Sequence, residues 1–174
     1  MNVSNFDKLY ELHHTNEWFK PKHLSMYRDF AFRAAQESSA VRRKVGAVIL
    51  SKKGSLFIGY NGTPSGDDNT CENSDFITKD NVIHAEDNAL RKMINENVDP
   101  QGSIIFITDS PCDKCTNNVI IDNGISAVFY FRYYTDDKPL EILNSNGVYT
   151  QYVDENYIEE LRKHIITGDI NHGR

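Results

Sequence analysis

The sequence lacks the features that mark membrane-spanning and secreted proteins. No apolar run in its 174 residues approaches the roughly 18 needed to suggest a membrane span. The N-terminal stretch is too polar and too acidic for a signal peptide. Cysteine is scarce, with only three residues, and an odd, sparse count argues against a disulfide framework. We therefore expect a cytoplasmic protein that has no membrane partner.

Basic residues are also too few to favour a polyanion as partner. The formal net charge is −6 at pH 7, whereas affinity for nucleic acid rests largely on Lys and Arg contacts to phosphate. We therefore expect no nucleic-acid partner, although one small anionic ligand in a local basic pocket is compatible with this charge. The sequence contains no internal repeat, low-complexity tract or linker. We expect an N-terminal extension over residues 1–22 and one compact domain over residues 23–174.

Hydrophobic periodicity predicts helices and strands that alternate along most of the chain. We expect helices over residues 23–38, 84–95, 112–123, 138–146 and 155–166. We expect strands over residues 45–50, 55–60, 104–108, 127–131 and 148–153. A polar loop over residues 61–81 is long for a compact domain, and such loops often carry function. The alternation indicates an α/β fold with three layers, α/β/α, around a sheet of roughly five strands.

Two short motifs carry residues that suit a catalytic zinc site. They are His84–Glu86 (HAE) and Pro111–Cys115 (PCDKC). One imidazole and two thiolates are good zinc ligands, and they leave the fourth tetrahedral position to water. In this order the motifs match H-x-E … P-C-x-x-C, the signature of zinc-dependent nucleobase deaminases. We therefore predict that His84, Cys112 and Cys115 bind Zn²⁺.

Glu86 distinguishes a catalytic site from a zinc ion that only holds the fold together. It follows His84 closely, near a helix start, where it reaches a metal-bound water more easily than the metal itself. It can take a proton from water and deliver it to the ring nitrogen and the departing ammonia. Cys112 and Cys115 share one face of a helix turn, whose N-terminus favours thiolate over thiol. Taken singly, the motifs also suit a redox pair, a structural metal site or a solvated helix start.

Further segments carry a resemblance to one family. They are Lys44–Ile49 (KVGAVI), Gly59–Gly66 (GYNGTPSG) and the region of Tyr134, together with the two motifs above. With them the chain resembles the deoxycytidylate deaminase family of the cytidine deaminase superfamily, in particular its phage-type members, over most of its length. The resemblance implies a cytidine deaminase-like fold with a mixed central sheet. It also implies that the domain is a zinc-dependent deaminase that converts dCMP to dUMP and ammonia, which supplies dUMP for dTMP synthesis.

The same resemblance implies roles for residues around the base and sugar. Asn61 is expected to hydrogen-bond the sugar 3′-hydroxyl, and the backbone of Ala85 to read an edge of the cytosine ring. Tyr134 is expected to pack near the pyrimidine and sugar, and Ser110 to be a further substrate contact. Without the resemblance, Asn61 reads as the start of an ordinary Asn-Gly turn. A shift of one residue in the match would transfer the tyrosine role to Tyr133.

A basic run, Arg42-Arg43-Lys44, precedes the first predicted strand. A guanidinium suits bidentate contact with phosphate, so we expect Arg42 and Lys44 to bind the 5′-phosphate of the substrate. The alternative is a solvated helix end, where the helix dipole favours basic residues.

Members of the family often form homohexamers and respond to dCTP as activator and dTTP as inhibitor. The resemblance therefore implies a homo-oligomer, as a hexamer or a dimer or trimer unit, with these effectors bound near Gly62, Thr63 and Gly66. Some viral relatives accept dCTP as substrate, so a dCTP deaminase or a dual dCMP/dCTP deaminase is an alternative. A polynucleotide cytosine deaminase is another, although it requires a basic groove with stacking platforms. A non-catalytic zinc-bound interaction domain is the third, but it has no use for Glu86.

Overall fold

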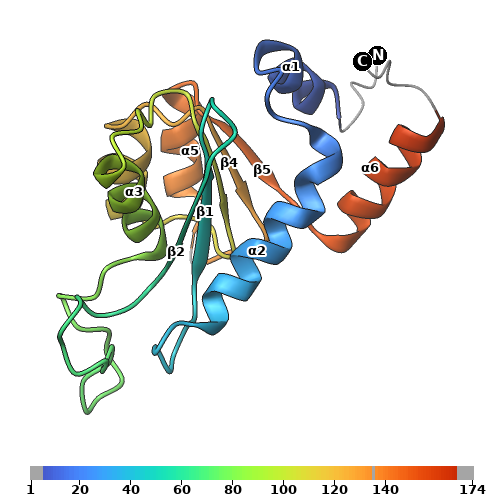
Figure 1. The fold of residues 1–174 in the computed structure, drawn as a ribbon. Helices are drawn as coiled ribbons and strands as arrows, with labels where there is room; N and C mark the ends of the chain where they lie inside the picture. The colour runs from blue at the N-terminus through green and yellow to red at the C-terminus, as the bar shows by residue number, and fades with distance from the viewer. Residues whose placement is uncertain (1–5, 135, 168–174) are drawn as a thin grey trace.

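Five strands form one mixed sheet at the centre of the molecule (Figure 1), and the computed structural model describes residues 6–134 and 136–167. In sheet order the strands are β2 (Leu56–Tyr60), β1 (Gly46–Leu50), β3 (Ile104–Ile107), β4 (Ala127–Tyr130) and β5 (Tyr149–Tyr152). β1 runs antiparallel to both β2 and β3, whereas β3, β4 and β5 run parallel to one another. The expected mixed sheet of five strands is confirmed.

Helices cover both faces of this sheet (Figure 1). One face carries α1 (Asp7–Thr15), a 3₁₀ turn (Pro21–His23), α2 (Leu24–Gln36) and α6 (Glu155–Thr167). The other carries α3 (Ala85–Asn95), α4 (Asp113–Cys115), the π-helix η2 (Thr116–Ile121) and α5 (Lys138–Ser145). In the described part of the chain, no helix is both long enough and apolar enough to cross a membrane.

The two faces of the sheet bury two separate apolar cores, because successive side chains of a strand point to opposite sides. In β1, Val48 and Leu50 join the core beneath α2, whereas Ala47 and Ile49 join the core beneath α3. The strand is therefore apolar at every position, as is usual for a strand that is covered on both faces. The expected three-layer α/β/α fold is confirmed.

The segment before the first predicted helix is more ordered than its sequence indicates. It contains α1, and the side chains of Leu9 and Phe19 are completely buried in the core that α2 covers. The nine residues of α1 contain too few apolar positions to give a helical period, so the periodicity of the sequence did not predict this helix. The division of the chain at residue 22 stays a prediction, although residues on both sides of it share one core.

Two other elements differ from the expectation. The predicted helix over residues 112–123 is a single α-helical turn, α4, that continues as the π-helix η2. The long loop over residues 61–81 is tied by two isolated β-bridges, one between Gly62 and Ile83 and one between Glu72 and Thr78. Short π-helical segments are often found at functional sites, and this one directly follows the second predicted zinc motif.

Two glycines allow one helix on each face to approach the sheet closely. A Cβ atom at Gly59 in β2 would lie 2.5 Å from the backbone nitrogen of Ala89 in α3, and closer still to the carbonyl oxygen of Ala85. A Cβ atom at Gly46 in β1 would lie 2.6 Å from the backbone nitrogen of Ala35 in α2. Neither gap admits a side chain, so Gly59 sets the distance between the sheet and the start of α3.

Candidate active site

Three residues at helix ends bring two sulfur atoms and one imidazole nitrogen together. His84 is the N-cap of α3, Cys112 is the N-cap of α4, and Cys115 is the last residue of α4. Their ligand atoms all lie within 4.8 Å of one another. His84 Nδ1 lies 3.5 Å from Cys112 Sγ and 3.3 Å from Cys115 Sγ. Tetrahedral zinc, with bonds of about 2.0 Å to nitrogen and 2.3 Å to sulfur, requires a separation of about 3.5 Å, so these residues fit zinc.

The electrostatics of the three residues also favour a metal. Cys112 accepts a hydrogen bond from the Cys115 thiol, and this bond lowers the pKa of Cys112 to about 4. The same hydrogen bond, together with burial, raises the pKa of Cys115. Hydrogen bonding to Cys112 raises the pKa of His84. Metal binding displaces these shared protons, because zinc takes the thiolate and neutral imidazole forms.

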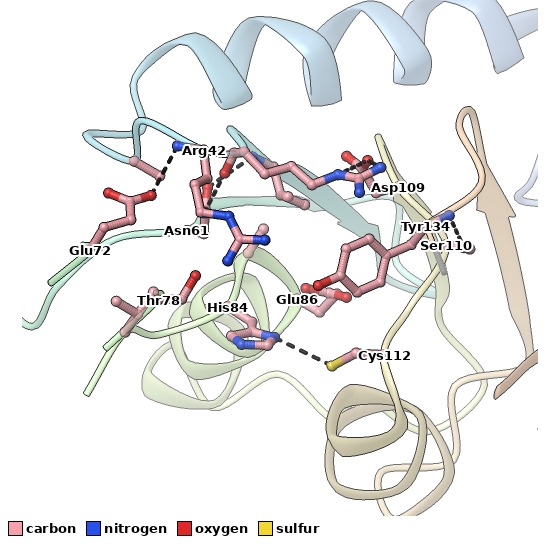
Figure 2. A pocket seen from close by; sticks show the side chains of 15 residues that line it. Arg42, Asn61, Glu72, Thr78, His84, Glu86, Asp109, Ser110, Cys112 and Tyr134 are labelled. Carbon is pink, nitrogen blue, oxygen red and sulfur yellow. Dashed lines mark hydrogen bonds and ion pairs between the residues drawn. The ribbon is translucent and has the colours of Figure 1, made fainter. Parts of the chain in front are cut away.

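Glu86 lies in the first turn of α3 and is only 4% exposed. Burial raises the pKa of its carboxyl group to about 7, against smaller lowering effects from its own backbone N–H and from His84. A nearby dication would lower this pKa, because it favours the ionised carboxylate. Glu86 lines the same cavity as His84 and Cys112 (Figure 2). The carboxyl group is therefore placed to move protons beside the metal ligands.

A cavity of about 220 Å³ lies beside these residues, walled by the start of α3 and by the segments that follow α2 and β2 (Figure 2). The lining residues are Ala40, Arg42, Arg43, Val45, Asn61, Glu72, Thr78, Val82, His84, Ala85, Glu86, Asp109, Ser110, Cys112 and Tyr134. Five of the predicted substrate contacts are among them: Arg42, Asn61, Ala85, Ser110 and Tyr134. The structure therefore brings most of the predicted binding residues to the predicted zinc ligands.

Arg42 and Asn61 face the cavity in different ways. The amide of Asn61 supports the wall, since its Oδ1 accepts a hydrogen bond from Val45 N at 2.8 Å and its Nδ2 donates to the Arg43 carbonyl at 2.9 Å. One amide hydrogen of Asn61 is left for a ligand. The guanidinium of Arg42 extends into the cavity (Figure 2) and forms no ion pair with any other residue of the described ranges. Arg42 is therefore free to bind an anion.

Tyr134 covers another side of the cavity and is held there from two directions. Its backbone N–H donates to Ser110 Oγ at 2.8 Å, and its ring lies 4.5 Å from the guanidinium carbon of Arg43. The neighbouring Tyr133 is not part of the lining, and its ring packs against Tyr130. Of the two tyrosines, Tyr134 is thus the one that reaches the site.

Lys44 and the three predicted effector residues are not part of the lining. The Lys44 carbonyl accepts a hydrogen bond from Arg132. Gly62 pairs with Ile83 in an isolated bridge at the start of the long loop. Thr63 and Gly66 follow in that loop, and their role in effector binding stays a prediction, as does that of Lys44 in phosphate binding.

Sequence reasoning missed two buried acids in the lining, Asp109 and Glu72. Asp109 is 3% exposed, and its carboxylate accepts hydrogen bonds from Arg43 Nε at 2.7 Å and from Arg132 Nη2 at 2.7 Å. Arg43 is thereby neutralised, which leaves Arg42 as the arginine of the basic run that is available to a ligand. Asp109 directly precedes the segment Ser110–Cys115, a position that could have drawn attention to it, whereas Glu72 lies in a polar loop without a periodic signal.

The fold and the site together define a class of protein. An α/β/α domain whose helix ends present one His and two Cys beside a buried Glu is the arrangement of the zinc-dependent deaminases of bases and nucleotides. A family model described as the cytidine and deoxycytidylate deaminase zinc-binding region matches residues 21–132. The chain belongs to this family, and its cofactor is zinc.

Known proteins similar to this chain include several deoxycytidylate deaminases. The enzyme of Schizosaccharomyces pombe is 30% identical over 142 residues, covering 75% of this chain and 44% of the relative. That of Mycobacterium phage D29 is 34% identical over 125 residues, covering 64% of this chain and 95% of the relative. The crystal structure of dCMP deaminase from the cyanophage S-TIM5 in complex with dCMP and dUMP superposes with a TM-score of 0.72 at 36% identity, covering 78% of this chain and 99% of that chain. The chain spans less than half the length of the two yeast relatives it matches.

Proposed function

We propose that this protein hydrolyses the amino group of a free cytosine deoxynucleotide, converting dCMP to dUMP and ammonia. The proposal rests mainly on one observation: the cavity is lined by zinc ligands, by the buried acid Glu86 and by Arg42, whose guanidinium has no ion-pair partner in the described residues. The zinc ligands and Glu86 suit the chemistry, and Arg42 suits the 5′-phosphate. The phage and cyanophage relatives support dCMP as the substrate, because they match this chain over nearly their whole length.

The residues of the chain have separate tasks in this reaction. His84, Cys112 and Cys115 would hold the zinc, which when bound would supply a water whose pKa is lowered to about 7 in favourable sites. Glu86 accepts a proton from the attacking water and delivers it to ring N3, as oxygen bonds to C4. Glu86 then takes the proton of the new C4 hydroxyl and gives it to the amino group, the C4–N bond breaks as the C4 carbonyl forms, and ammonia departs. Water and substrate thus supply every atom of dUMP and ammonia.

The size and charge of the cavity support a single nucleotide as substrate. The cavity has a volume of about 220 Å³, and both the long loop and Tyr134 contribute to its walls. One unpaired guanidinium, that of Arg42, suits one phosphate. The alternative that stays in the proposal is dCTP as a second substrate, whose outer phosphates would extend beyond Arg42 towards solvent.

The proposal includes the setting in which the enzyme works. We place it in the cytoplasm, because Cys112 and Cys115 serve as metal ligands only where thiols stay reduced. Supply of dUMP for dTMP synthesis, assembly into a homo-oligomer, and control by dCTP and dTTP are further parts of the proposal. They rest on the resemblance of the chain to the dCMP deaminase family.

Ammonia release from the zinc-loaded protein tests the proposal. The substrates dCMP, dCTP, deoxycytidine and a cytosine-containing single-stranded oligonucleotide are compared in parallel, with and without dCTP or dTTP as effector. We expect dCMP to give the highest kcat/KM. Preference for dCTP would keep the zinc chemistry but require a different phosphate site, and reaction of the oligonucleotide alone would refute the assignment to free nucleotides.

A further inference from the structure

The loop between β2 and α3 places a buried acid at the edge of the cavity. Glu72 is 7% exposed, although the loop residues that follow it are exposed. The bridge between Glu72 and Thr78 and the hydrogen bond from Lys79 N to the Cys71 carbonyl, at 2.8 Å, hold the backbone of this part of the loop. The position of the Glu72 carboxylate is therefore fixed by the loop.

The partners of this carboxylate are two successive backbone N–H groups. The N–H of Val41 lies 3.1 Å and 3.2 Å from its two oxygens, and the N–H of Arg42 lies 3.0 Å from one of them (Figure 2). No cation of the described residues forms an ion pair with Glu72. Successive backbone N–H groups that face one anion are a typical anion-binding arrangement, and here the chain supplies the anion itself.

The segment that Glu72 holds has other support at its start, where Ser38 Oγ donates a hydrogen bond to the Asn61 carbonyl and Ala40 is buried beside Cys71. Residues 38–44 connect α2 to β1 without regular structure, and the side chain of Val41 is 75% exposed. In this segment the N–H of Ala40 bonds to Ser38 Oγ, and the Arg43 carbonyl bonds to Asn61. Between these two anchors, the backbone N–H groups of Val41 and Arg42 have no hydrogen-bond partner among the described residues other than Glu72, and the Arg42 side chain enters the cavity from this backbone.

An acid in this position is otherwise a disadvantage for a site that binds phosphate. The Glu72 carboxylate lies in the wall of the same cavity as the Arg42 guanidinium. Its negative charge therefore repels a negatively charged phosphate bound there, and partial desolvation strengthens this repulsion. Both oxygens of the carboxylate accept backbone hydrogen bonds, so the carboxylate is engaged by the backbone of residues 41 and 42. An acid at this position is favourable if fixing Arg42 improves phosphate binding by more than the repulsion between the Glu72 carboxylate and the phosphate weakens it.

We propose that Glu72 is a positioning residue that gives the site its preference for a phosphorylated substrate, by fixing the backbone of Arg42 so that its guanidinium meets the 5′-phosphate. This inference rests on the proposed function. It assigns to the long loop a task in substrate selection, separate from the proton transfers at Glu86.

The test compares Glu72→Ala and Glu72→Gln with Asp75→Asn, which changes the charge of an exposed acid on the same loop. Steady-state kinetics with dCMP and deoxycytidine give the ratio of the two kcat/KM values for each protein. Glu72→Ala should raise KM for dCMP about tenfold with kcat unchanged, the effect of losing hydrogen bonds to a charged group, and leave deoxycytidine unaffected. Glu72→Gln, whose amide oxygen can still accept, should recover part of the loss, and Asp75→Asn should match the wild type.

A double-variant cycle shows whether Glu72 acts through Arg42. If it does, Glu72→Ala should add little to the loss that Arg42→Ala already causes with dCMP. Calorimetric binding of dUMP and deoxyuridine gives the same comparison without turnover. Equal losses with dCMP and deoxycytidine, full additivity in the cycle, or tighter dUMP binding by Glu72→Gln would each overturn the inference. A wild-type enzyme that does not prefer dCMP to deoxycytidine would instead refute the proposed function.

Discussion

Substituting Gly59 by alanine tests whether the closeness of α3 to the sheet sets the geometry of the active site. Ordinary contact with a Cβ atom begins at 3.4 Å, whereas a Cβ at position 59 would lie 2.5 Å from Ala89 N and closer still to the Ala85 carbonyl oxygen, so β2 and α3 must separate by at least about 0.9 Å. The obstructing atoms belong to the helix backbone and have no rotamer to change. The separation therefore moves the start of α3, which carries His84 and Glu86.

The structural cost and the functional cost of this change differ in size. Overpacking of this kind lowers the free energy of unfolding by about 1–3 kcal/mol, and each kcal/mol lowers Tm by about 2–4 °C in a domain of this size. A displacement of about 1 Å at a catalytic group can lower the rate about 100-fold. We therefore expect Gly59→Ala to fold, with a moderately lower Tm, a large loss of kcat and weaker zinc binding.

Gly46→Ala is the matched control, because it creates a clash of similar severity on the opposite face of the sheet. Its Cβ would lie 2.6 Å from Ala35 N in α2, a helix that carries no zinc ligand. Thermal unfolding and zinc titration with a competing chelator compare the two variants. We expect the two variants to lose similar amounts of Tm. We expect zinc binding to weaken only in Gly59→Ala. Equal weakening in both variants, or wild-type kcat in Gly59→Ala, would refute the reasoning.

Four further changes test the roles of individual side chains. Glu86→Gln should keep zinc while kcat falls by about 10²–10⁴-fold, because an amide cannot carry the proton; loss of zinc in metal analysis would contradict this role. Cys115→Ala should lose both zinc and thermal stability, because this buried sulfur is a metal ligand, and metal analysis with thermal unfolding checks it. Asp109→Asn should lower the free energy of unfolding by about 1–3 kcal/mol in urea denaturation, because Arg43 loses the charge of its partner. Burial raises the pKa of Tyr149 from 10.0 to about 12, so its contribution to stability, fully present below pH 10, should disappear as the pH rises to about 12. Tyr149→Phe should remove that part of the decline in unfolding measurements across this pH range.

The elements that the sequence predicted well are those in which burial imposes a period. The three central strands, β1, β3 and β4, are apolar and buried throughout because helices cover both of their faces. The zinc ligands were predictable for a related reason, since metal chemistry restricts both the residue types and their spacing. α1 escaped prediction because only Leu9 is fully buried in it, with Tyr10 and Leu12 partly buried, and so few apolar positions leave no clear period to detect.

The end of the cavity at which we propose that phosphate binds, called here the phosphate end, was harder to predict, because it depends on pairings between distant parts of the chain. The basic run indicates an anion site, yet the residue that faces the cavity is decided by Asp109, which lies 66 positions after Arg43 and neutralises it. Lys44 belongs to the same run but lies outside the lining. The sequence therefore predicted both Arg42 and Lys44, and the tertiary structure distinguishes them, because only Arg42 of the two lines the cavity.

The zinc site and the phosphate end of the cavity are held by different parts of the fold, so substitutions in them should have different effects. The metal ligands stand at helix ends that are packed against the sheet, so a change among them alters the chemistry and the fold together. The phosphate end is held by two acids on connecting segments, Glu72 and Asp109, whose partners are backbone N–H groups and exposed arginine side chains. Both acids lie outside the strands and helices themselves. Changes in substrate preference should therefore arise at Glu72, Arg42 and Asp109 with the rate of the chemical step preserved, and a selection for dCTP or deoxycytidine use should recover variants at these positions first.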